Sequence, residues 1–140
     1  MKNQKPGLEN LKAMLSKAEH KLASAQREFE MGFVSDSASR AYYAAYHAIS
    51  AVLAHHGLTF SSHAQLLGAF NRGFVKTGIF PPDTFKKLQR MFLDRNIADY
   101  QISKTVSRQV AEKDIANAKL LVEACREYLE KKTGHKFSAA

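Results

Sequence analysis

Apolar residues recur at alternating steps of three and four along most of this chain, and this spacing restricts its fold more than any other feature. The period matches that of an α-helix with one buried face. Alternation of apolar and polar residues, which would indicate a strand, is nowhere sustained. The sequence therefore predicts an all-α, up-and-down bundle of four to five helices. The expected helices cover about residues 8–31, 38–57, 62–77, 81–100 and 107–130.

Residues that favour helix ends separate these segments. Serine and aspartate side chains can accept a hydrogen bond from the free backbone N–H groups at a helix start. The predicted caps are Ser35–Ser37 before the second helix, Ser62 before the third and Ser107 before the last. The third helix is expected to close at Thr77–Gly78, and Pro81–Pro82 can begin the fourth because proline is tolerated in a first turn.

The length of 140 residues fits one domain over residues 1–140, with residues 131–140 expected to form a flexible basic tail. Cys125 is the one cysteine, so an internal disulfide is excluded, and no residue cluster has the spacing of a metal site. Neither a metal nor a cofactor is expected. The stretch Ala41–Ala54 is too short and too polar to span a bilayer. A cytoplasmic protein without membrane contact is therefore predicted.

The net charge of +8 and the isoelectric point of about 9.7 point to a polyanionic partner such as RNA, DNA or nucleotide phosphate. A basic surface without any such partner fits the same numbers. Charge gives no information about the fold.

The second predicted helix carries Arg40, Tyr43 and His47 on one face, three and then four residues apart. Arginine offers a planar fork for phosphate, tyrosine can stack on a base, and histidine can exchange a proton near neutral pH. These residues would suit a nucleotide. The alternative is structural, with Tyr43 and His47 packed and Arg40 extended along the surface.

The fourth predicted helix carries charged residues where its apolar stripe continues. Arg95 and Asp99 follow this stripe, so they are expected to pair with each other or to line a groove. In the second case Asp99 orients Arg95 toward an anion, and Tyr100 lies beside them. His63 opens the third helix and fits either a general acid or base or a packed helix-start residue.

Three segments together resemble the HEPN family of helical domains. Residues 39–48 read Ser-Arg-Ala-Tyr-Tyr-Ala-Ala-Tyr-His-Ala, similar to the family signature Arg-Ala-Tyr-Tyr-Ala-x-Phe-His-Ala. Residues 62–63 together with 74–78 form the second segment. Residues 95–100 read Arg-Asn-Ile-Ala-Asp-Tyr, similar to the family's Arg-x-x-Ala-Asp-Tyr. The resemblance covers about residues 8–130.

The resemblance implies a homodimer with a cleft where the two protomers meet. It also implies a nucleotide or RNA ligand and a small nucleotidyltransferase as partner protein, in a pair of the toxin–antitoxin or defence type. Arg95 would bind phosphate, Asp99 would orient it, and Tyr100 would line the same cleft. The adjoining wall would be formed by Arg40, Tyr43 and His47.

Many HEPN relatives are metal-independent endoribonucleases with an Arg-x(4–6)-His motif. This chain has no histidine at that spacing after Arg95, so the motif is incomplete on the fourth helix, where Tyr100 stands in that region. Arg40 and His47 have the spacing but lie about 10 Å apart along the second helix. A ribonuclease would therefore rely on Arg95 with His47 or His63. The leading interpretation is a domain that binds a nucleotide or RNA, and the alternatives are this ribonuclease and a non-catalytic protein-interaction module.

Overall fold

The computed structural model describes residues 5–137, and all regular secondary structure in that range is helical. The all-α bundle prediction is confirmed. Five α-helices and one π-helical segment follow one another along the chain: α1 (Leu8–Glu30), α2 (Val34–His55), α3 (His63–Phe70), η1 (Asn71–Val75), α4 (Thr84–Tyr100) and α5 (Arg108–Thr133).

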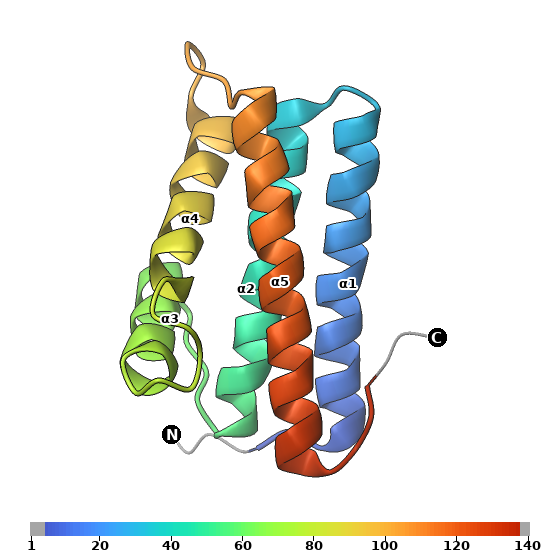
Figure 1. The fold of residues 1–140 in the computed structure, drawn as a ribbon, viewed down its shortest axis with the longest axis vertical. Coiled ribbons are helices and arrows are strands. Elements are labelled where there is room, and N and C mark those ends of the chain that lie inside the picture. Colours follow the sequence, from blue (N-terminus) through green and yellow to red (C-terminus); the bar gives the residue numbers. More distant parts are fainter. Residues whose placement is uncertain (1–4, 138–140) are drawn as a thin grey trace.

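Four long helices, α1, α2, α4 and α5, run up and down beside one another (Figure 1). Helix α3 packs on α2, and η1 packs on α4. Helix α2 is central because it packs on α1, α4 and α5. Its buried face is rich in alanine, which lets neighbouring helix backbones approach closely. The connections α1–α2 and α4–α5 lie at the same end of the bundle.

The predicted apolar stripes form the core. Every stripe residue predicted for α2 and α5 is buried. In α1 two positions depart from a continuous buried row: Leu8, at the helix start, is exposed, and Leu22, in the second half, is half-buried. Tyr42, in the middle of α2, is the largest side chain with almost no exposed surface. The helical period of the sequence therefore identified which face of α1, α2 and α5 is inside.

Two of the three predicted N-caps are present. The Ser62 hydroxyl accepts a hydrogen bond from the Gln65 N–H at 3.4 Å, and Ser107 accepts one from Val110 at 3.2 Å. The cap prediction for Ser35–Ser37 is wrong, because α2 already begins at Val34. Within that first turn, the Ser37 hydroxyl donates to the Val34 carbonyl oxygen at 2.6 Å instead of capping.

The excursion between α2 and α4 also differs from the prediction. The third helix ends as α3 at Phe70 and continues as the wider π-helical turn η1, which is followed by turns up to Pro82. Helix α4 begins at Thr84, after the two prolines. Gly78 adopts a left-handed backbone with φ of +85°, which ends this excursion at the predicted glycine.

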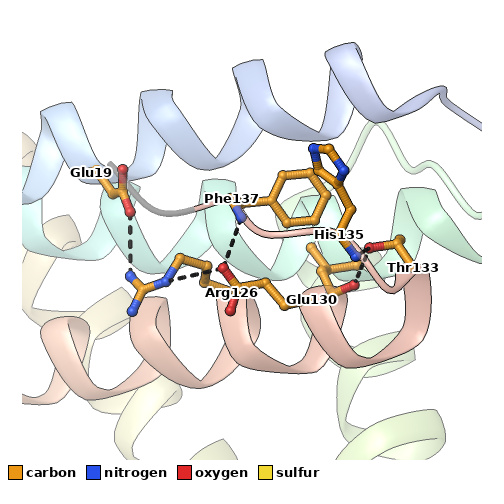
Figure 2. A network of polar contacts seen from close by, with 7 residues as sticks. Glu19, Arg126, Glu130, Thr133, His135 and Phe137 are labelled. Carbon is orange, nitrogen blue, oxygen red and sulfur yellow. Dashed lines mark hydrogen bonds and ion pairs between the residues drawn. The ribbon is translucent and has the colours of Figure 1, made fainter. Parts of the chain in front are cut away.

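The C-terminal segment is ordered further than expected. Helix α5 extends to Thr133, and the Phe137 side chain is only 4% exposed. The Phe137 N–H donates to Glu130 Oε2 at 2.8 Å, and Arg126 joins Glu130 to Glu19 of α1 (Figure 2). The tail predicted from residue 131 thus begins with the last turn of α5 and includes a buried phenylalanine, whose packing the sequence did not show. Residues 138–140 lie outside the described part.

None of the helices within residues 5–137 combines the length and the apolar character needed to cross a membrane.

Candidate functional site

A groove of about 480 Å³ lies between α1 and α2 and reaches Asp99 of α4; we call it the α1–α2 groove. Four residues predicted from the sequence line it: Arg40, Tyr43, His47 and Asp99. The first three share one face of α2 because they are spaced by three and four residues. The structure thus brings the predicted wall on α2 together with one acidic residue of α4.

Helix α1 supplies two cations that the sequence interpretation missed. Lys17 and Lys21 are one turn apart, line the groove, and are close enough to His47 to lower its pKa by charge repulsion. They directly precede Ala18 and Leu22 of the apolar stripe, so they border the buried face of α1. That position was the available signal, but the sequence alone did not show which neighbour they would face.

The groove has a cationic end and an acidic end, because α1 and α2 are antiparallel. Lys17 and Lys21 lie beside His47 at one end. At the other end Arg40 Nε lies 3.6 Å from Glu28 Oε1, and Asp36 is nearby on the groove wall. An anion would therefore be attracted to the end that holds the two lysines, rather than to Arg40, whose charge is already balanced.

His47 is neutral at physiological pH. Burial, followed by the positive charges of Lys17, Lys21 and then His63, lowers its pKa to about 4. Its ring can therefore accept a hydrogen bond or a proton from a bound molecule. An anion bound next to the ring would raise this pKa, because a nearby negative charge favours the imidazolium form.

Arg95 is buried, and each of its two terminal guanidinium nitrogens donates a hydrogen bond. Its Nη2 donates to the Tyr43 hydroxyl at 2.6 Å, and its Nη1 donates to Asn96 Oδ1 at 2.7 Å. The Nε atom lies 3.4 Å from Asp99 Oδ2, and the side chain is 9% exposed. Asp99 thus pairs with Arg95, and the guanidinium lies behind Tyr43 and does not line the groove.

Aromatic rings surround this guanidinium. Its carbon lies between 5.1 and 5.8 Å from the ring centres of Tyr42, Tyr43 and Phe92 and of the 70%-exposed Tyr100. Such distances allow cation–π attraction, which is strongest where water is excluded. We call the mutually contacting rings of Tyr42, Tyr43, Tyr46, His63 and Phe92 the ring cluster.

His63 belongs to the ring cluster and does not line the groove. Its Nδ1 lies 2.6 Å from the Tyr42 hydroxyl, and its ring stacks on Tyr46 with centres 4.4 Å apart. Burial and the charge of Arg95 lower the pKa of His63, while burial raises the pKa of Tyr42 above its ordinary value. His63 is therefore committed to Tyr42 through one ring nitrogen, and only Nε2 is free to meet another group.

Of the seven residues predicted from the sequence, four line the groove and three lie outside its lining. Arg40, Tyr43, His47 and Asp99 line the groove, while Arg95 lies behind Tyr43. His63 lies on the far side of Tyr46, and Tyr100 covers Arg95 from the outside. Across residues 5–137, histidine, cysteine and carboxylate side chains do not gather in threes as a metal site would need.

The chain is similar to known proteins over most of its length. A family model described as "HEPN domain" matches residues 11–128, a range that contains every predicted site residue. A "UPF0332 protein" of Archaeoglobus fulgidus is 32% identical over 124 residues, which cover 89% of this chain and 98% of that protein. "Putative toxin MJ0605" of Methanocaldococcus jannaschii is 29% identical over 87% of this chain and 90% of its own length. A "UPF0332 protein" of Thermotoga maritima is 47% identical over 62 residues, which span less than half of either chain.

Proposed function

The chain belongs to the HEPN domain family, and from this premise we propose that it binds the phosphate of a nucleotide or RNA in the α1–α2 groove. One observation carries the proposal: two lysines, a neutral histidine and tyrosine rings converge on one side of an open groove. Its volume of about 480 Å³ lies within the range of small-molecule sites.

The residues of the groove have separate roles in this proposal. Lys17 and Lys21 attract a phosphate as point charges, and His47 accepts a hydrogen bond from a sugar hydroxyl or, once protonated, donates one to phosphate. Tyr43 and Tyr46 offer ring surfaces to a base, a contact worth about 1–3 kcal/mol per stacked base. Arg95 acts indirectly, by holding the Tyr43 hydroxyl in place at 2.6 Å.

The test is titration of a short fluorescein-labelled single-stranded RNA. Lys17→Ala/Lys21→Ala should weaken binding and reduce the slope of log K against log salt by about 1.4, or about 0.7 for each lost phosphate contact. The matched control is Lys12→Ala/Lys119→Ala, which removes two exposed charges outside the groove. Equal affinity and equal slope in the two double variants would refute the assignment to the groove.

A second candidate function is metal-independent RNA cleavage, which the neutral His47 beside two lysines favours. A toxic activity of this kind would also fit the similarity to "Putative toxin MJ0605" of Methanocaldococcus jannaschii. His47 would take the proton of the RNA 2′-hydroxyl as that oxygen attacks the adjacent phosphorus. The bond from phosphorus to the 5′-oxygen of the next nucleotide would break, and this oxygen would take up a proton from water. The lysines would stabilise the added negative charge on the phosphate. Arg95 would contribute only through Tyr43, unlike the direct role implied by the family motif.

Cleavage and retention can be separated by incubating the protein with a mixed RNA pool and EDTA. A ribonuclease would shorten the RNA, and His47→Ala would abolish the shortening while the Lys12→Ala/Lys119→Ala variant kept it. Retention without shortening, weakened in Arg95→Ala and in Lys17→Ala/Lys21→Ala, would identify a binding domain. Shortening that survives in His47→Ala would refute the catalytic role of this histidine.

We further propose a homodimer with a nucleotidyltransferase partner in the cytoplasm. Met31 and Phe33 of the α1–α2 connection and Tyr100 and Ile102 near the end of α4 are large exposed apolar side chains. Both connections lie at one end of the bundle (Figure 1), so this end is suited to contact another protein. Light scattering of the wild type and of Phe33→Ser/Ile102→Ser tests this. A monomeric mass for the wild type would refute the dimer and leave a heteromeric interaction module as the alternative.

A further inference from the structure

Two aspartates are buried between α4 and α5, on a face of the bundle that the α1–α2 groove does not reach. Asp94 is 2% exposed and Asp114 is 1% exposed, which is rare for carboxyl groups unless they are paired. The two side chains are within hydrogen-bonding reach of each other. Asp94 directly precedes Arg95 on α4, whereas Asp114 belongs to α5.

The hydrogen bonds of this pair are incomplete if both groups are ionised. Asp94 Oδ1 lies 3.6 Å from Arg90 Nε. The Oδ2 atoms of Asp94 and Asp114 have no hydrogen-bond donor among the described residues. Two carboxylates can only accept, so they cannot satisfy each other. One proton held between them provides a donor for one oxygen and removes one of two adjacent buried negative charges.

We propose that Asp94 and Asp114 share a single proton, and that this acid pair clamps α4 to α5 and thereby positions Arg95 in the ring cluster. Asp94 is the residue of α4 in this pair. The next residue, Arg95, donates a hydrogen bond to the Tyr43 hydroxyl of α2. A shift of this part of α4 would therefore move Arg95 relative to Tyr43. The positioning of Arg95 matters for ligand binding only if the proposed function holds, whereas the shared proton does not depend on it.

The charges around the pair come from its own two helices. Arg90 of α4 and Lys113 of α5 favour ionisation, while burial and the neighbouring Asp94 oppose it. Burial is the largest influence, and the pKa of Asp114 is raised to about 8. Among the buried residues of α1 and α2, both described over their full length, there is no carboxylate, amine or guanidinium. A second groove, between α4 and α5, lies outside the pair, and its charged lining includes Asp83, Lys86 and Lys87.

Carboxyl titration by ¹³C NMR of aspartate-labelled protein tests the shared proton directly. The wild type should show one buried carboxyl that releases its proton near pH 8. Asp114→Asn should remove this transition, because its amide supplies the donor permanently. If neither buried carboxyl holds a proton at neutral pH, the acid pair is refuted.

The pH dependence of unfolding gives an independent measurement. The folded pKa of Asp114 is about 8, and the unfolded pKa of an aspartate is about 3.9, so unfolding between these values releases about one proton. Stability from the pair is complete below the unfolded pKa and is lost as the pH rises toward 8. Histidines with lowered pKa values act in the opposite direction, but only below about pH 6.5. The denaturation midpoint of the wild type should therefore decrease as the pH is raised from 6.5 to 8, whereas the midpoint of Asp114→Asn should not change.

The role in positioning is tested by RNA affinity over the same pH range. The wild type should lose RNA affinity as the pair ionises above pH 8, and Asp114→Asn should retain it. If the NMR transition is present but the affinities of both proteins follow the same pH profile, the positioning role is overturned and the acid pair stands. If neither protein binds RNA, the proposed function fails, and the titration still decides whether the proton is shared.

Discussion

Replacement of Arg95 by alanine tests whether this residue is a structural support or an open phosphate ligand. The guanidinium is 9% exposed on the side chain and donates to Tyr43 and Asn96 at 2.6 and 2.7 Å. A residue with these partners stabilises the folded protein, whereas a free ligand-binding arginine would contribute little. Arg95→Ala removes both hydrogen bonds, the ion pair with Asp99 and the packing of the arginine stem between rings.

The two hydrogen bonds set most of the expected loss. A hydrogen bond to a charged group contributes about 1.5–3 kcal/mol, and the low end applies because water can reach the half-buried Tyr43 and Asn96. The ion pair adds almost nothing, because the Asp99 side chain is 30% exposed and screened by solvent. The free energy of unfolding should therefore fall by about 3 kcal/mol, a large fraction of the 5–15 kcal/mol typical of a small domain.

Urea denaturation followed by circular dichroism at 222 nm measures this loss. Arg95→Met keeps an apolar stem between the rings, so it separates packing from hydrogen bonding and should lose slightly less stability than Arg95→Ala. Arg40→Ala is the matched control, because that arginine is 43% exposed and has one ion pair at 3.6 Å, worth about 0–1 kcal/mol. A loss below about 1 kcal/mol in Arg95→Ala, equal to that of Arg40→Ala, would refute the support role.

Three further predictions concern the groove and the helix ends. The pKa of His47 is about 4, and a bound phosphate would raise it. RNA binding should therefore take up a proton, and the affinity should increase as the pH falls from 7 to 5. Calorimetry should find no such proton uptake in His47→Gln. Ser107→Ala should lower the free energy of unfolding by about 1 kcal/mol through loss of the α5 cap, and no change in urea midpoint would contradict the 3.2 Å contact. Phe137→Ala should cost about 3 kcal/mol if this side chain is packed as described, whereas an unchanged melting temperature would restore the flexible tail.

The long helices could be predicted from the sequence because each one encodes its buried face locally. The stripe from Ala111 to Leu129 is spaced by helical turns, and the Ser107 cap requires only residues within the same turn. The start of α2 could not be read in this way. Val34 and Ser35 become helical where the chain also meets the α4–α5 connection, since Ser35 Oγ accepts from the Val106 N–H at 3.4 Å. That contact joins residues far apart in the sequence.

The sequence predicted which residues belong to the candidate site better than it predicted which of them line the groove and which lie behind it. The period of α2 placed Arg40, Tyr43 and His47 on one face, and the structure places all three on the groove wall. The sequence could not show that Arg95 would point into the ring cluster, since this depends on how α4 crosses α2. The two lysines of α1 were missed for the same reason: lysines beside an apolar stripe are usually solvated, and only the packing of α1 on α2 turns Lys17 toward His47.

The positions of the tyrosines mean that their fluorescence can report ligand binding without an added label. The chain has five tyrosines and no tryptophan, so no indole masks their ultraviolet emission. Three of the five, Tyr42, Tyr43 and Tyr46, belong to the ring cluster, and Tyr100 lies over the same guanidinium. A molecule that enters the α1–α2 groove therefore touches or displaces fluorophores that dominate the signal of the whole chain. Unlabelled nucleotides can be screened by tyrosine fluorescence alone, without any change to the protein.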